Sequence, residues 1–97
     1  MKILIVEDEK KLSGFIEKGL KQAGYLTVIC HNGSVALQKA AEDKYDLILL
    51  DLMLPGLNGF EVLKNLRAFK ILSPVIIVSA LSDTKQVVEG LDLGAVD

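Results

Sequence analysis

Short apolar runs alternate with longer amphipathic stretches along this chain, and this alternation restricts the fold more than any other feature. The four runs rich in Leu, Ile and Val span residues 3–6, 26–30, 45–51 and 74–79. They are continuous rather than alternating, as is typical of parallel strands covered on both faces by helices. Four strand–helix units imply right-handed crossovers between parallel strands. The sequence therefore predicts a doubly wound α/β sheet.

The first two helices are predicted from apolar spacing and from turn residues. In the first, apolar residues at three- and four-residue intervals form one stripe, which comprises Leu12, Phe15, Ile16, Gly19, Leu20 and Ala23. Gly24 follows this stripe as a helix stop. Asn32-Gly33-Ser34 predicts a turn and a cap before a second helix over about residues 35–43.

The third helix follows a loop at residues 55–59, in which Gly56 and Gly59 are interpreted as turn glycines. Its inner face is predicted to comprise Val62, Leu63 and Leu66. The fourth helix is predicted over about residues 83–91.

Composition excludes several classes of protein. With 97 residues, 51% of them hydrophobic and 25% charged, the chain is expected to form one globular domain. No apolar run approaches the roughly 20 residues of a membrane span, and no secretory signal begins the chain, so we expect a cytoplasmic protein. The net charge is −2 with dispersed lysines, which predicts no direct contact with nucleic acid. The single cysteine, Cys30, is interpreted as a small buried hydrophobe.

Three acidic residues stand where predicted strands end. Glu7 and Asp8 lie just past the first strand, and Asp51 closes the third. Doubly wound sheets bind ligands beyond the carboxyl ends of their strands. Carboxylates that converge there would repel one another unless one were protonated or a cation were bound, and oxygen ligands of this kind suit Mg²⁺. We therefore expect a magnesium site.

The same residues suggest a reaction. A carboxylate attacks a phosphoryl donor poorly because both are anionic, and a bridging divalent cation removes that barrier. Asp51 is the expected nucleophile, Asp8 a direct metal ligand, and Glu7 a ligand directly or through water. The backbone carbonyl of Met53 can add an oxygen, and the Ser79 hydroxyl can contact the phosphoryl oxygens.

Each of these residues also has an ordinary structural interpretation. Glu7 or Asp8 alone can cap a helix, Asp51 alone can begin a turn, and Ser79 alone is more often a cap than a ligand. Their occurrence together at the ends of three strands favours a site. His31, the single histidine, follows the second strand and is expected to lie away from the crevice without a catalytic role.

The sequence around these positions resembles the receiver domains of two-component response regulators. The resemblance rests on Glu7-Asp8 after the first strand, on residues 51–59 (DLMLPGLNG) after the third, and on Ser79-Ala80 after the fourth. Within the family, Glu7-Asp8-Glu9 looks most like members that carry a winged-helix DNA-binding domain.

The resemblance implies a flavodoxin-like fold with strand order 2-1-3-4. It also implies phosphotransfer from a sensor histidine kinase to Asp51, with Mg²⁺ held by Glu7, Asp8, Asp51 and the Met53 carbonyl, and with Ser79 touching the phosphoryl group. Such a domain is a regulatory phosphoacceptor rather than an enzyme for a metabolite. It normally controls an attached output domain, here expected to regulate transcription through DNA binding in the full-length protein.

Two family features have no counterpart here, namely a lysine at the end of a fifth strand and an aromatic residue within it. The chain stops at residues 94–97, where that strand would begin, so residues 1–97 are interpreted as one receiver domain that is incomplete at its C-terminus. Without the fifth strand and helix we expect an exposed sheet edge and an exposed apolar face. Such a surface predicts self-association, strand exchange or a fused partner.

Three other functions fit these residues less well. A module that keeps the fold but does not switch is the main alternative, because the lysine and the terminal strand are absent. Phosphatases of the haloacid dehalogenase type need an acid two residues after the nucleophile, where this chain has Met53. Dinucleotide or flavin binding would need a glycine-rich turn in place of Glu9-Lys10-Lys11.

Overall fold

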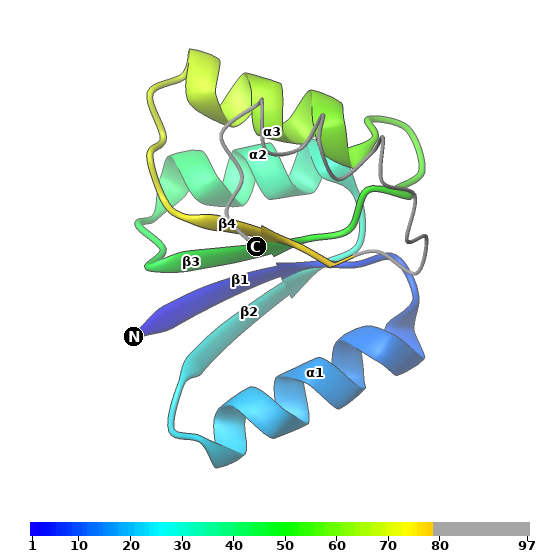
Figure 1. Cartoon of the computed structure of the whole chain (residues 1–97), viewed down its shortest axis with the longest axis vertical. Helices are drawn as coiled ribbons and strands as arrows, with labels where there is room; N and C mark the ends of the chain where they lie inside the picture. The colour runs from blue at the N-terminus through cyan, green and yellow to red at the C-terminus, as the bar shows by residue number, and fades with distance from the viewer. Residues whose placement is uncertain (79–97) are drawn as a thin grey trace.

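The structure of the protein is a computed structural model, which describes residues 1–78. Strands and helices alternate as the sequence predicts (Figure 1). The elements are β1 (Lys2–Val6), α1 (Lys10–Gln22), β2 (Leu26–Cys30), α2 (Gly33–Glu42), β3 (Leu47–Leu50), α3 (Gly59–Ala68) and β4 (Val75–Ile77). The helix predicted at residues 83–91 lies outside the described residues, as does Ser79.

The four described strands form one parallel sheet in the order β2-β1-β3-β4. Val6 at the end of β1 stands opposite both Cys30 of β2 and Leu50 of β3. The carboxyl ends of these three strands therefore meet at one edge of the sheet. The predicted doubly wound sheet and its strand order are confirmed.

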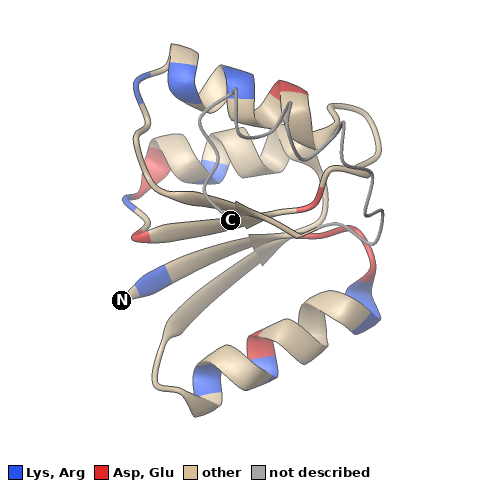
Figure 2. Cartoon of the chain, in the orientation of Figure 1, with Lys and Arg blue, Asp and Glu red and all other residues tan. Residues whose placement is uncertain are grey.

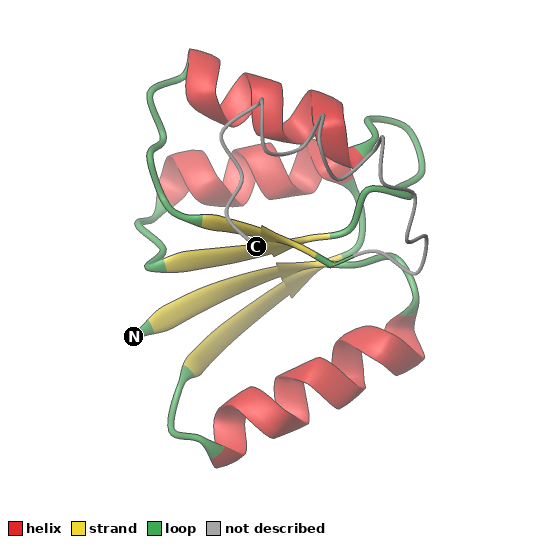
Figure 3. Cartoon of the chain, in the orientation of Figure 1, coloured by secondary structure: helices red, strands yellow, loops and turns green. Residues whose placement is uncertain are grey.

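Helices cover both faces of the sheet (Figure 3). On the face covered by α2 and α3, the core contains Leu4, Ile48 and Leu50 together with the predicted inner face of α3, whose three side chains Val62, Leu63 and Leu66 are at most 1% exposed. Strand side chains alternate between faces, so the buried Ile3 and Ile5 point toward α1.

The predicted apolar stripe of α1 is only partly correct. Phe15 is 77% exposed, whereas Ser13 is fully buried and donates its hydroxyl to the Lys10 carbonyl at 3.1 Å. At about 100° per residue, Phe15 lies about 200° around the helix from Ser13 and so faces away from the sheet. Leu12, Ile16 and Leu20 are half-buried. A small polar residue is thus the buried residue of this helix, and an aromatic residue is exposed.

Helix ends follow the turn chemistry of the sequence. Gly24 has a φ of +92°, which fits its predicted role as a helix stop, and Asn32 caps α2 by accepting a hydrogen bond from the Val35 N–H at 2.9 Å. Asn58 and Glu61 form a reciprocal capping box at the start of α3. None of the helices in the described part of the chain is long and apolar enough to cross a membrane.

Candidate functional site

Glu7 is the first residue beyond β1, and its backbone and carboxylate are both held. Its N–H donates to the Cys30 carbonyl at 3.0 Å, which continues the β1–β2 ladder by one bond. Its side chain is 5% exposed and accepts a hydrogen bond from the Glu9 N–H at 3.1 Å. A carboxylate is therefore fixed inside the crevice rather than extended into water.

Asp51 is the first residue beyond β3, the neighbouring strand. Its N–H donates to the Val6 carbonyl at 3.0 Å, and its side chain is 7% exposed. One carboxylate oxygen, Oδ1, accepts a hydrogen bond from the Met53 N–H at 3.0 Å. The turn that follows β3 thus fixes the orientation of this carboxylate.

The two strand ends bring three carboxylates together. Glu7, Asp8 and Asp51 each offer an oxygen, and these atoms all lie within 4.8 Å of one another. Figure 2 shows this acidic cluster where β1 and β3 end. Asp8 is exposed, whereas the other two acids are buried, so the cluster meets solvent at Asp8.

The cluster has no basic partner among residues 1–78. The two ion pairs found there, Lys2 with Asp43 and Lys21 with Glu17, involve none of the three acids. Burial raises the pKa of the Glu7 carboxyl to about 7; the hydrogen bond from Glu9 opposes this, and the neighbouring Asp51 adds to it. Three oxygen donors around an excess of negative charge are a donor set that fits a hard divalent cation.

The loop after β3 is packed tightly beneath Asp51. Gly59 is not a turn glycine, as the sequence had suggested, but the first residue of α3. A Cβ built on it would lie 2.4 Å from the Asp51 carbonyl oxygen, so only glycine allows α3 to start this close to the site. Gly56 has a φ of +72° and does match its predicted turn role.

His31 is closer to the site than the sequence suggested. Its ring Nδ1 lies 2.8 Å from the Glu7 carbonyl oxygen, so the expectation that it stands apart from the crevice is wrong. The pairing of the strands, which sequence spacing did not show, explains why His31 lies near Glu7. His31 follows β2, and β2 pairs with β1 so that both strands end at the same edge.

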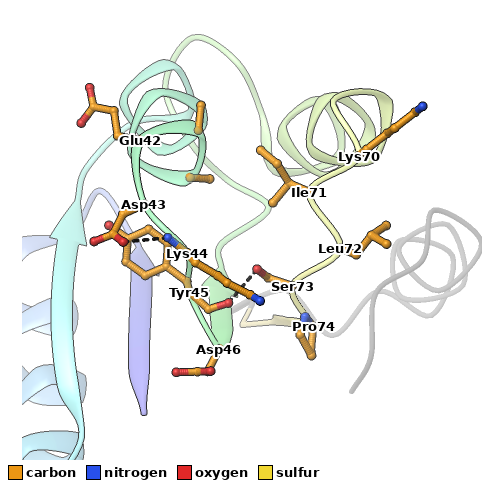
Figure 4. A pocket seen from close by; sticks show the side chains of 12 residues that line it. Glu42, Asp43, Lys44, Tyr45, Asp46, Lys70, Ile71, Leu72, Ser73 and Pro74 are labelled. Carbon is orange, nitrogen blue, oxygen red and sulfur yellow. Dashed lines mark hydrogen bonds between the residues drawn. The ribbon is translucent and has the colours of Figure 1, made fainter.

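A groove lies at the other end of the sheet, away from the acidic cluster. It has a volume of about 710 Å³ and runs between the α2–β3 and α3–β4 connections (Figure 4). Its wall is fixed by the Ser73 hydroxyl, which donates to the Tyr45 carbonyl at 2.7 Å, and by Lys2, whose ammonium lies 5.2 Å from the Tyr45 ring centre. None of the predicted site residues Glu7, Asp8, Asp51 and Met53, which lie in the described part of the chain, lines it.

The strand order of the sheet and the acidic cluster together define a doubly wound α/β protein with a candidate cation site at the carboxyl ends of its strands. A sequence model of the response regulator receiver domain matches residues 3–97, and the chain belongs to this family. The resemblance noted in the sequence is thereby confirmed.

Individual relatives agree with this assignment. The chain is 50% identical over 96 residues to the response regulator ArlR of Staphylococcus saprophyticus, a match that covers 99% of this chain and 43% of ArlR. It is 42% identical over 97 residues to the transcriptional regulatory protein CusR of Escherichia coli, covering 100% of this chain and 43% of CusR. The chain thus spans less than half the length of these curated relatives.

Solved structures of receiver domains are also similar to this chain. The receiver domain of the Francisella response regulator 1452 matches with a TM-score of 0.94 and 40% identity, over 99% of this chain and 79% of that one. The BeF3-activated N-terminal receiver domain of Klebsiella pneumoniae RstA matches with a TM-score of 0.92 and 30% identity, over 98% of this chain and 80% of that one.

Proposed function

We propose that the protein is a phosphorylation-dependent signalling switch in which Asp51 accepts a phosphoryl group from a sensor histidine kinase. The observation that carries the proposal is the cluster of Glu7, Asp8 and Asp51, whose oxygens lie within 4.8 Å of one another without a basic partner in the described residues. Mg²⁺ would be held by these three carboxylates and by the Met53 carbonyl.

The geometry of Asp51 suits nucleophilic attack. The Met53 N–H engages Oδ1 at 3.0 Å, so Oδ2 is the oxygen available to bond to phosphorus. As that bond forms, the bond from phosphorus to the donor histidine nitrogen breaks, and an aspartyl phosphate results. A bound divalent cation would neutralise the repulsion between the anionic acceptor and donor. Burial of Asp51 limits competing contact with water.

The proposal also includes two residues that lie outside the described part of the chain. The Ser79 hydroxyl would contact the phosphoryl oxygens, and Ala80 beside it would leave room for the donor. Their support is the position of Ser79 two residues after β4, which pairs with β3, the strand that precedes Asp51.

The output of such a switch would lie in another domain. The relatives named as transcriptional regulatory proteins are more than twice as long as this chain, which supports a role in controlling a transcription-regulating domain. The location that we propose is the cytoplasm. The domain itself would act as a regulatory phosphoacceptor, not as an enzyme for a metabolite. We also propose that isolated chains self-associate through β4, the last strand in the order of the described sheet, and through the sheet face on the α1 side.

The test uses beryllofluoride, a phosphoryl mimic, monitored by ¹⁹F NMR with and without Mg²⁺. Wild type should show a bound signal that requires Mg²⁺, and Asp51→Asn should show none. Asp46→Asn is the matched control, because Asp46 accepts a hydrogen bond from the Lys2 N–H at the opposite end of the sheet. It should bind as wild type does.

A phosphoryl donor extends the test to chemistry. Wild type should incorporate phosphate from phosphoramidate with Mg²⁺ and lose it with excess chelator. Equal incorporation by Asp51→Asn would show that another residue is the acceptor. Absence of both beryllofluoride binding and phosphate incorporation in wild type would favour the alternative of a protein-interaction module that keeps the fold without switching.

A further inference from the structure

The histidine ring beside the site makes one defined contact. His31 Nδ1 lies 2.8 Å from the carbonyl oxygen of Glu7, and the ring is partly buried. A carbonyl oxygen can only accept a hydrogen bond, so Nδ1 must carry a hydrogen in this contact. The imidazole therefore donates to the backbone of a residue in the acidic cluster.

The place of this contact follows from how the β1–β2 ladder ends. The Glu7 N–H donates to the Cys30 carbonyl at 3.0 Å. In a parallel ladder, the next bond would run from the Asn32 N–H to the Glu7 carbonyl. No such backbone bond is found among residues 1–78, because the chain turns at Asn32 to cap α2. The His31 side chain supplies the missing donor.

The Glu7 carbonyl matters because it belongs to the peptide unit that joins Glu7 to Asp8. Peptide units are planar, so fixing this carbonyl also fixes the direction in which the chain enters Asp8. The Glu7 N–H and carboxylate are already held by Cys30 and Glu9. The ring contact adds a restraint on the Glu7 carbonyl, next to the exposed Asp8.

We infer that His31 is a positioning residue, which holds the Glu7–Asp8 peptide so that both carboxylates face one cation. This inference rests on the proposed function, because it assigns His31 a part in shaping the cation site. The residue would act through the backbone of Glu7 and would not touch the metal or the phosphoryl group.

Metal affinity measures this effect directly. Mn²⁺ serves as the probe, with free ion followed by electron paramagnetic resonance during titration of the 97-residue chain. His31→Phe keeps a ring but has no donor, and it should weaken Mn²⁺ binding about tenfold, as loss of groups that orient metal ligands commonly does. His31→Asn places an amide N–H near the position of Nδ1, and it should stay within about twofold of wild type.

A purely structural role would give a different pattern. In that case both variants would lose stability in urea without metal, and their Mn²⁺ affinities would not differ from each other. Nitrogen NMR of the imidazole adds an independent readout. The inference requires a hydrogen on Nδ1, and the hydrogen bond to the Glu7 carbonyl should protect this hydrogen from exchange with water. A ring with hydrogen on Nε2 alone would overturn it.

Two outcomes separate this inference from the proposed function. If Asp8→Ala weakens Mn²⁺ binding but His31→Phe does not, the cation site stands and the role of His31 is wrong. If wild type itself binds no Mn²⁺, the proposed function and this inference both fail.

Discussion

The two buried acids of the site differ from the third in how firmly they are held. Glu7 and Asp51 each have a backbone bond to the neighbouring strand and a carboxylate bonded to an N–H two residues on. Asp8 is exposed beside them. The fixed pair therefore sets the geometry of the cluster, and a cation entering from solvent would meet Asp8 at its open side.

Replacing the acceptor should remove function without harming the fold. Asp51→Asn keeps an oxygen that can accept from the Met53 N–H and removes one of three mutually repelling acids. We expect the metal-free variant to be as stable as wild type or more stable by about 1 kcal/mol, equivalent to a pKa change of about one unit. Urea unfolding with chelator measures this. A clear loss of stability would indicate that the Asp51 charge stabilises the fold.

The raised pKa of Glu7 predicts how metal-free stability depends on pH. The pKa is about 7 in the folded chain against an ordinary 4.5, so the folded state binds this proton more tightly. The resulting stabilisation is complete below pH 4.5 and is lost as the pH rises to 7. Its size is at most about 3 kcal/mol.

Glu7→Gln isolates this contribution. Urea unfolding at several pH values in the presence of chelator should show a decline in wild-type stability over that range that the variant lacks. The same pH dependence in both proteins would mean that Glu7 titrates normally in the folded chain.

At the scale of elements, α3 is held against the site by its first residues. Gly59 leaves no room for a Cβ beside the Asp51 and Leu52 backbone, whereas Gly14 in α1 has nothing within 4 Å of that position. Gly59→Ala should therefore destabilise the fold by about 1–3 kcal/mol through overpacking. Gly14→Ala is the matched control and should stabilise it by about 0.5–1 kcal/mol through helix propensity.

Thermal or urea unfolding compares the two variants, and beryllofluoride binding reports on the site. We expect Gly59→Ala to weaken that binding because displacement of α3 would move the Asp51 backbone. Equal stability of the two alanine variants would show that α3 can shift without cost.

Sequence patterns predicted the parts of the fold that depend on repetition. Apolar runs located all four described strands, and the alternation of strands and helices predicted the parallel doubly wound sheet, whereas its strand order was implied by the family resemblance. Spacing alone could not show which side of α1 faces the sheet. Ser13 is buried with its hydroxyl bonded to a carbonyl of its own helix, whereas the apolar Phe15 is exposed. The roles of His31 and Gly59 depend on contacts between segments, which no local pattern records.

At the scale of the whole molecule, we predict that the chain self-associates. The side chains of Val75 and Ile77 join the core on the α2–α3 face, so Ile76 points to the opposite face, where it is half-buried. Light scattering should show a mass above that of a monomer that falls on dilution. Ile76→Thr should lower it, whereas Leu72→Ser, a change in a loop residue that is 78% exposed, should not. A monomer at all concentrations would contradict the proposal.

The pairing of β1 with β3 has a consequence for folding. Glu7 and Asp51 become neighbours only when Val6 of β1 pairs with Leu50 of β3, and this pairing closes the long loop of chain between the two strands. An unfolded chain does not hold the cluster together, so a cation that binds there would bind the native state alone and raise its stability with concentration. Mg²⁺ would then act as a reversible cross-link between the first and third strands, and the unfolding rate would fall as Mg²⁺ is added.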